Sequence, residues 1–227
     1  MHELTFASTA LMICVAAGAY LAGCCNGAII TSFLFYRDDI RRHGSHNAGL
    51  TNFYRVYGEK FAICVILVDM LKAFVAVKLG SAVFDAYLGL RLEGEYFSAL
   101  FCVIGHIFPA FYSFKGGKGI AATAGLILAI HPAFIPMGVI LFFGTFLLTH
   151  YVSLGSLLVY AGFLIEMVIM GQMDLFSMPV GHRTEMYVIA AFLTAMAYWK
   201  HRENIKRLLS GTERKTYLFK KNKEALN

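Results

Sequence analysis

The chain has 227 residues and a net charge of +6, and 58% of its residues are apolar while only 15% are charged. Soluble domains average roughly 45–50% apolar and about 25% charged residues, so this composition excludes an ordinary water-soluble globule. The 47 residues between Lys118 and Glu166 include no Asp, Glu, Lys or Arg, although about 20 apolar residues suffice for one bilayer crossing. The sequence therefore predicts an all-α integral membrane protein that forms a single polytopic domain over residues 1–227.

Apolar stretches between charged segments mark the predicted transmembrane helices. In chain order they are 7–36, 61–77, 96–114, 119–131, 133–149, 151–171 and 186–199. Several are short enough to be tilted, broken or only partly inserted. About seven crossings are therefore predicted, with five or six as alternatives.

Basic residues gather beside these apolar stretches, and 16 of the 20 lie in the segments 37–60, 115–119 and 200–227. A basic excess beside membrane spans is typical of cytoplasmic segments. Seven crossings place all three segments on the cytoplasmic side, with the N-terminus outside, the C-terminus in the cytoplasm and 79–95 as an outside loop. Because the charges occur in short flanking segments, binding to nucleic acid is not predicted.

The first apolar stretch allows one rival interpretation. Leu21-Ala22-Gly23-Cys24 resembles the cleavage box of a bacterial lipoprotein signal, but a secretory signal needs a positively charged n-region, and none precedes this stretch. The five cysteines lie in apolar stretches without the spacing of metal ligands, so neither a disulfide nor a metal site is predicted.

The first polar segment, 41–52 with Arg55, alternates small, hydroxyl and amide residues with glycine. Glycine lets backbone N–H groups approach an anion, and the arginine fork matches a phosphate group. The candidate site residues here are Gly44, Ser45, Asn47, Gly49, Thr51, Asn52 and Arg55. A turn-rich loop that caps a helix is the plainer alternative.

The second polar segment places two lysines and three glycines directly before an apolar helix. Ammonium groups and free amides at a helix N-terminus favour an anion. The candidates are Lys115, Gly116, Gly117, Lys118 and Gly119. The pattern does not fit a Walker A loop, and positively charged topology anchors are the alternative.

The third polar segment, 200–213, follows the last crossing. On a helix His201 and Asn204 share one face and point together into one site, and Arg207 is a further candidate for substrate binding. The alternative is a solvated basic helix attracted to anionic lipid. Asp69 and Lys72, three residues apart inside the second crossing, are interpreted as an ion pair that supports the site.

Together these segments resemble the bacterial membrane acyl-phosphate:glycerol-3-phosphate acyltransferases. The matching stretches are 44–52 with Arg55, 105–123 and 201–213, which occur in family order across almost the whole chain. The resemblance implies seven helices and an active site at the cytoplasmic leaflet of the bacterial inner membrane. It also implies acyl transfer from acyl phosphate to the sn-1 hydroxyl of glycerol 3-phosphate, giving lysophosphatidic acid and phosphate. No cofactor or metal, and no partner beyond these substrates and membrane lipid, is expected.

The resemblance places Ser45, Arg55, Lys115, His201 and Asn204 at the catalytic centre, and the glycines of the first two segments become phosphate-binding backbone. An acyl phosphate is already activated, so direct attack by the glycerol hydroxyl needs no acyl-enzyme. Either His201 or the departing phosphate would take the proton. No histidine here starts the His-x-x-x-x-Asp pattern that thioester-dependent acyltransferases commonly display.

The chain departs from the family pattern at three places. His46 and Ala73 each stand where the family usually has glycine, and residues 23–26 replace a Gly-Ser-x-Pro stretch. A transporter of a phosphorylated metabolite remains the alternative function, since basic loops and broken helices suit it too. Transporters often show internal repeats, however, and no convincing repeat is present here.

Overall fold

The computed structural model describes residues 5–217, and within that range the regular structure is helical, with no β-strand. Three helical stretches are long and apolar enough to cross a membrane, Phe6–Cys24, Arg91–Tyr112 and Val152–Gln172. The all-α class is thereby confirmed, while the number of crossings and the orientation of the chain stay predictions. Lys220, Lys221 and Lys223 of the basic tail lie outside the described residues.

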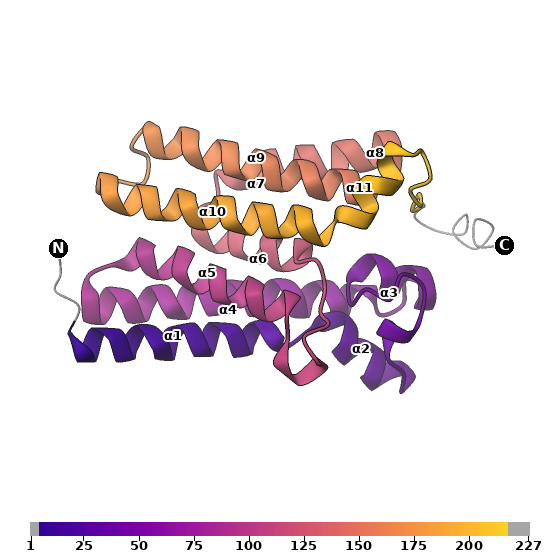
Figure 1. Cartoon of the computed structure of the whole chain (residues 1–227), viewed down its shortest axis with the longest axis horizontal. Coiled ribbons are helices and arrows are strands. Elements are labelled where there is room, and N and C mark those ends of the chain that lie inside the picture. Colours follow the sequence, from indigo (N-terminus) through magenta and orange to yellow (C-terminus); the bar gives the residue numbers. More distant parts are fainter. Residues whose placement is uncertain (1–4, 218–227) are drawn as a thin grey trace.

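The helices form a bundle with two layers (Figure 1). The N-terminal half comprises α1 (Phe6–Cys24), α2 (Gly27–Tyr36), η1 (Ile40–Arg42), α3 (Leu50–Tyr57), α4 (Ala62–Leu88), α5 (Arg91–Ile107), η2 (Ala110–Tyr112) and α6 (Ile120–Ile130). The C-terminal half comprises α7 (Phe134–Val139), the π-helical η3 (Ile140–Gly144), α8 (Thr145–Thr149), α9 (Val152–Gln172), α10 (Val180–Lys200) and α11 (Arg202–Leu209). Helices α1, α4 and α5 lie in one layer, α7 to α10 in the other, and α6 between them.

The predicted crossing over 7–36 consists of two helices, because the chain breaks between α1 and α2 at Cys25 and Asn26. A buried ion pair of α4 binds both free helix ends at this break. Lys72 Nζ donates to the carbonyl oxygens of Gly23 at 3.1 Å and Cys25 at 2.7 Å. Asp69 Oδ1 accepts the Gly27 N–H at 3.0 Å. Cations favour a helix C-terminus and anions a helix N-terminus, so the pair stabilises the break.

The loop predicted over 79–95 is wrong in its length, since α4 continues to Leu88 and α5 begins at Arg91, while its side of the membrane stays a prediction. Only Gly89 and Leu90 connect them, and Gly89 takes the left-handed conformation with φ of +66°. Two of the charged residues in this stretch are paired, Glu95 with Lys78 at 3.1 Å and Glu93 with His182.

The α-helix within the predicted crossing over 96–114 ends early, since α5 stops at Ile107 and the short helix η2 carries the apolar stretch on to Tyr112. Pro109 follows, and its ring cannot continue an α-helix with normal hydrogen bonding. The chain then passes through η2 and an irregular connection to the start of α6. This departure from helix puts Lys115 and Lys118 on a loop at one end of the bundle.

Small side chains allow the helices of the N-terminal layer to approach closely. Ala19, Ala73, Cys102 and Ala122 form a buried cluster between α1, α4, α5 and α6. Ala73 is fully buried and fits into this cluster. Close approach through small residues is typical of helix packing in membranes, and it holds α4 and α5 in fixed positions beneath the polar loops.

Candidate functional site

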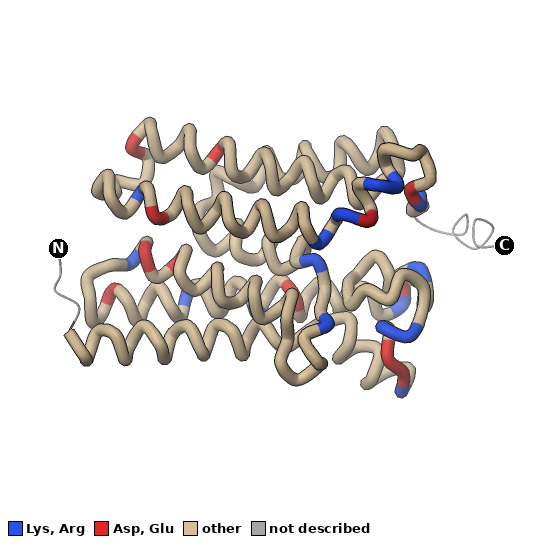
Figure 2. Tube along the Cα trace, in the orientation of Figure 1, with Lys and Arg blue, Asp and Glu red and all other residues tan. Residues whose placement is uncertain are grey.

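Lysine and arginine gather at the end of the bundle that carries α2, α3 and α11 (Figure 2). The three polar segments identified in the sequence lie at this end, on η1 and α3, on the loop before α6, and on α11. The other end holds Glu95 paired with Lys78, and Glu93 paired with His182. The candidate site is therefore built at one end of the molecule.

Glu213 is the centre of the polar network at this end. Its Oε1 accepts hydrogen bonds from Asn204 Nδ2 at 2.7 Å and from Ser153 Oγ at 2.8 Å, and its Oε2 accepts from Arg207 Nε at 2.7 Å. Burial opposes ionisation, but these hydrogen bonds from Asn204, Ser153 and Arg207 hold the pKa of Glu213 below its usual value. The side chain is thus a buried carboxylate that fixes α9 and α11 together.

Lys118 of the second segment reaches the third segment. Its Nζ donates a hydrogen bond to Asn204 Oδ1, so the amide of Asn204 bridges Lys118 and Glu213. Burial lowers the pKa of Lys118 to about 8, with Glu213 opposing and Arg207 and Arg55 adding to the decrease. Lys118 still carries a positive charge at neutral pH.

His201 ends α10 and is 2% exposed. Its Nδ1 lies 2.8 Å from the carbonyl oxygen of Ala197. Burial, followed by repulsion from Lys118, lowers the pKa of His201 to about 4. The imidazole is therefore neutral at pH 7, and because Nδ1 must donate to the carbonyl, Nε2 carries the lone pair.

Arg55 lies in the last turn of α3 and contacts the chain that follows α11. Its Nη2 donates to Thr216 Oγ1 at 2.6 Å and to the carbonyl oxygen of Arg214 at 3.0 Å. Burial lowers the pKa of Arg55, and the carboxylate of Glu213 opposes this decrease. The first and third segments thus meet at Arg55.

The first segment folds into a tight loop around Asn52. Gly44 has φ of +62°, and a Cβ there would lie 2.3 Å from Asn52 Oδ1. Asn52 Oδ1 accepts the Ser45 N–H at 2.8 Å, and its Nδ2 donates to the carbonyl of His43 at 3.0 Å. Asn52 and Gly44 therefore shape the loop, while Ser45 is exposed at its surface.

Gly49 and Thr51 lie at the beginning of α3, where Gly49 is the N-cap and Thr51 is in the first turn. The Gly49 N–H donates to the carbonyl of Asn47 at 3.0 Å. This amide is used within the loop, so the structure does not leave it free for an anion.

Gly116 and Gly117 have a packing role that the sequence did not reveal. Their N–H groups donate to the carbonyls of Ile107 and His106, each at 3.2 Å. A Cβ on Gly117 would lie 2.6 Å from the carbonyl oxygen of Ala48. The first and second segments are thus in contact at Gly117, and these two amides are already paired. Gly119 is the N-cap of α6.

The structure brings the three segments together pairwise, at Ala48 with Gly117, at Lys118 with Asn204, and through the contacts of Arg55 with the chain after α11. Arg55, Lys118, Asn204 and Arg207 gather around Glu213, with His201 close by. Ser45 and Lys115 lie at the same end but outside this group. Both are exposed, and neither side chain forms a hydrogen bond within residues 5–217.

Sequence reasoning missed Glu213, Ser153 and Thr216 as members of this network. Glu213 lies in a polar stretch directly after α11, which was a usable signal. Ser153 comes from the start of α9 and Thr216 from beyond the third motif. The packing of α9 against α11 reveals Ser153, and the contacts of the chain after α11 with Arg55 and His150 reveal Thr216.

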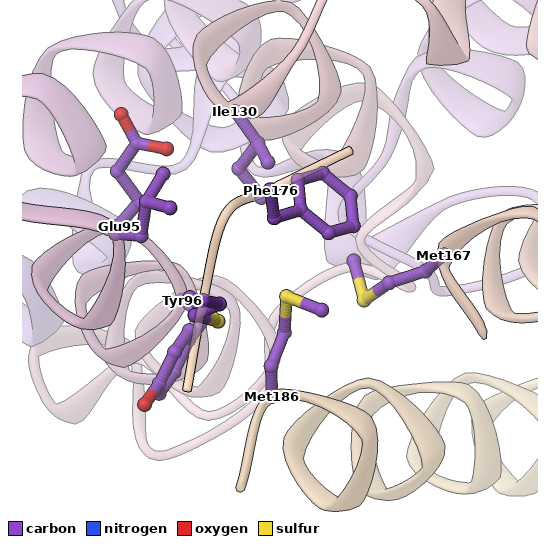
Figure 3. A pocket seen from close by; sticks show the side chains of 8 residues that line it. Glu95, Tyr96, Ile130, Met167, Phe176 and Met186 are labelled. Carbon is purple, nitrogen blue, oxygen red and sulfur yellow. The ribbon is translucent and has the colours of Figure 1, made fainter. Parts of the chain in front are cut away.

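An enclosed cavity lies elsewhere, between the ends of α5, α6, α9 and α10 (Figure 3). It measures about 10 Å³, which is room for roughly one water molecule. Its lining is mostly apolar and includes Ile130, Met167, Phe176 and Met186, with Glu95 at the edge. It is a packing gap and too small for a metabolite.

Comparisons with known proteins agree on one family. Residues 13–211 match the family described as Glycerol-3-phosphate acyltransferase. The chain is 39% identical over 219 residues to the glycerol-3-phosphate acyltransferase of Mycoplasmopsis synoviae, covering 92% of this chain and 96% of the relative. It is 40% identical over 198 residues to that of Finegoldia magna, covering 86% and 91%.

Two solved structures are also similar. The first is PlsY (YgiH), an integral membrane glycerol 3-phosphate acyltransferase in its glycerol 3-phosphate form, with a TM-score of 0.77, 30% identity and coverage of 91% of this chain and 96% of that one. The second is the lysophosphatidic acid form, with a TM-score of 0.74, 27% identity and coverage of 95% and 98%.

Proposed function

Because the chain belongs to the glycerol-3-phosphate acyltransferase family, we propose that it transfers a fatty acyl group from acyl phosphate to the sn-1 hydroxyl of glycerol 3-phosphate. The products are lysophosphatidic acid and inorganic phosphate. The reaction takes place at the cytoplasmic leaflet of a bacterial inner membrane, where the basic segments lie by the positive-inside rule. The solved relatives bear the names of glycerol 3-phosphate and lysophosphatidic acid forms, which supports this substrate and this product.

The observation that carries the proposal is the cationic group around Glu213. Arg55, Lys118 and Arg207 supply three positive charges to one buried carboxylate. The excess of positive charge suits a site that receives two phosphate-bearing reactants. Arg55 offers a fork to one phosphate, and Lys118 a point charge.

The acyl-transfer step needs no covalent enzyme intermediate. The glycerol hydroxyl oxygen forms a bond to the carbonyl carbon of the acyl phosphate, and the bond from that carbon to the phosphate oxygen breaks. The bonding electrons leave with the phosphate, and the hydroxyl proton passes to a phosphate oxygen. The protein contributes positioning and fixed charge.

His201 orients the attacking hydroxyl in this proposal. Because its ring is neutral and Nε2 carries a lone pair, Nε2 can accept a hydrogen bond from the glycerol hydroxyl. A pKa of about 4 makes His201 a weak base at neutral pH, because proton transfer is most efficient when the pKa lies near the working pH. The departing phosphate is therefore the better proton acceptor, and Asn204 aligns Lys118 beside it.

Ser45 and Lys115 complete the site from its open side. The Lys115 ammonium group forms no hydrogen bond within the described part of the chain, and Ser45 Oγ is likewise exposed. Both groups are available to bind the acyl phosphate as it enters from the membrane interface.

The test is an assay of purified protein in detergent with acyl phosphate and glycerol 3-phosphate. Release of phosphate that requires both reactants supports an enzyme, since a transporter needs sealed compartments to show net movement of its substrate. Replacement of acyl phosphate by acyl-CoA tests the donor, and we expect no turnover with it.

The Lys118→Ala variant tests whether this group of residues is the active site. Loss of this buried cation should reduce kcat/KM by about 10²–10³-fold, the effect of removing one group that stabilises developing charge. Lys206→Ala is the control, because Lys206 is exposed and its one ion pair within residues 5–217 is with Glu203 at 3.3 Å. Equal activity of the two variants would contradict the placement of the site.

A further inference from the structure

Residues 212–217, named here the C-terminal strap, cross from the end of α11 toward α3. The strap is anchored at Glu213 by the side chains of Asn204 and Ser153. It is anchored again at Thr216, whose N–H donates to the carbonyl oxygen of His150 at 2.9 Å. Both anchors belong to the C-terminal half of the bundle, so the strap is a fixed extension of that half.

The strap also binds Arg55 of the N-terminal half, once between the two anchors and once at the second anchor. Arg55 Nη2 donates to Thr216 Oγ1 at 2.6 Å and to the Arg214 carbonyl at 3.0 Å. Thr216 is 5% exposed, so its hydroxyl has little competition from water. Within residues 5–217, Nε and Nη1 of Arg55 donate to no acceptor. A guanidinium has five N–H donors, so the strap holds one edge and leaves the rest for an anion.

The rest of α3 does not explain how Arg55 is held. Asn52 binds the carbonyls of Ile40 and His43, and Tyr57 binds Asp38, all within the segment that precedes α3. α3 has only eight residues. An arginine side chain in its last turn has many rotamers to choose from, and the strap selects one of them.

We infer that Thr216 is a positioning residue, which orients the Arg55 guanidinium toward a phosphate group of the substrates. This inference rests on the phosphate-binding role proposed above for Arg55. Thr216 lies beyond residue 211, where the family match ends, and outside the three polar segments identified in the sequence.

The experiment compares Thr216→Val with Thr216→Ser in the full-length chain. Valine keeps the shape and removes the hydroxyl, whereas serine keeps the hydroxyl. We expect Thr216→Val to raise KM about tenfold, which is the size of effect that the loss of a hydrogen bond to a charged group produces. Its kcat should stay within about threefold of the wild-type value. Thr216→Ser should have the wild-type KM. Separate titrations of acyl phosphate and glycerol 3-phosphate identify which phosphate Arg55 binds.

Two controls separate positioning from general stabilisation. Thr212→Val removes a strap hydroxyl that contacts Ser210 at 2.8 Å and not Arg55, so it should leave both KM values unchanged. In an Arg55→Ala background, Thr216→Val should cause no further loss of glycerol 3-phosphate affinity, measured by calorimetry, because the hydroxyl acts through Arg55. Should Thr216→Val fail to fold, as judged by its melting curve, Thr216→Ala replaces it.

The outcomes distinguish this inference from the function on which it rests. Wild-type KM values in a folded Thr216→Val variant, or an equal loss of affinity in the Arg55→Ala background, overturn the positioning role alone. Unchanged KM values in Arg55→Ala overturn the role of Arg55. Absence of turnover by the wild-type protein overturns the proposed reaction itself.

Discussion

His46 adopts a left-handed backbone conformation, with φ of +58°, at a position where the sequence resemblance leads us to expect glycine. L-residues other than glycine pay about 1–2 kcal/mol for this conformation. The ring offsets part of this cost, since His46 Nδ1 lies 3.0 Å from the carbonyl oxygen of Arg41. The substitution is therefore tolerated locally, next to Ser45, and the fold of the loop is kept.

His46→Gly should be more stable than His46→Ala by about 1 kcal/mol, because only alanine keeps the left-handed strain after the ring contact is lost. Thermal unfolding of the two variants in the same detergent measures the difference. An alanine variant as stable as the glycine variant would show that the loop relaxes away from this conformation.

The pH dependence of substrate binding should follow the charge on Lys118. Its pKa is lowered to about 8 by burial, so the cation is present below that pH and is lost as the pH rises through it. We expect 1/KM for glycerol 3-phosphate to fall above pH 8, and Lys118→Arg to flatten this fall, because arginine stays protonated. Identical pH profiles for the two proteins would exclude Lys118 as the titrating group.

Among the elements, the break between α1 and α2 depends on side chains of a third helix. Lys72 and Asp69 of α4 pair at 2.7 Å and bind the two free helix ends. Lys72 also lies 2.9 Å from His106 Nδ1, and the backbone of His106 accepts the Gly117 N–H. The ion pair thus connects the break to the loop that carries Lys118.

Lys72→Met should destabilise the protein by about 3–5 kcal/mol, because it removes the cation from a buried carboxylate and leaves only His106, at 3.4 Å, and the Gly27 N–H beside it within the described residues. The double variant Asp69→Asn with Lys72→Met should recover part of this loss, since no buried charge then remains while the oxygen of the introduced amide can still accept the Gly27 N–H. Melting temperatures in detergent provide the comparison. A double variant less stable than Lys72→Met would mean that the ion pair does not act as a unit.

For the molecule as a whole, the two ends of the bundle differ in charge, and the candidate site occupies the basic end (Figure 2). The positive-inside rule predicts that this end faces the cytoplasm. The α9–α10 connection, which includes Asp174, lies at the opposite end. The orientation of the whole bundle in the membrane can therefore be tested by finding which face of the membrane each end lies on.

In a variant whose native cysteines are replaced by alanine, Arg42→Cys and Lys206→Cys should react with a membrane-impermeant thiol reagent only when the cytoplasmic face of the vesicles is exposed. Asp174→Cys should react only from the opposite face. All three positions are exposed on the protein. Labelling of Arg42→Cys and Lys206→Cys from opposite faces would contradict a common compartment for the first and third segments.

Much of the architecture could be predicted because it depends on local composition. The apolar stretches 119–131 and 151–171 agree with the helices α6 and α9 within a residue at each end, since charge-free apolar stretches must be helical in a bilayer. The ends of the helices that contain charged residues were predicted less accurately. The apolar pattern cannot show that Lys78 pairs with Glu95 across two helices, or that Asp69 and Lys72 bind helix ends.

The sequence by itself determined the membrane class, the family and the three polar segments, because each of these depends on the residue types within continuous stretches of the chain. Tertiary structure alone decided that Gly117 touches Ala48, that Lys118 binds Asn204 and that Arg55 binds Thr216. It also decided that the amides of Gly116 and Gly117 are used within the fold. Those contacts join residues far apart in the chain, and they exist only because the packing of helices against one another sets which polar groups meet.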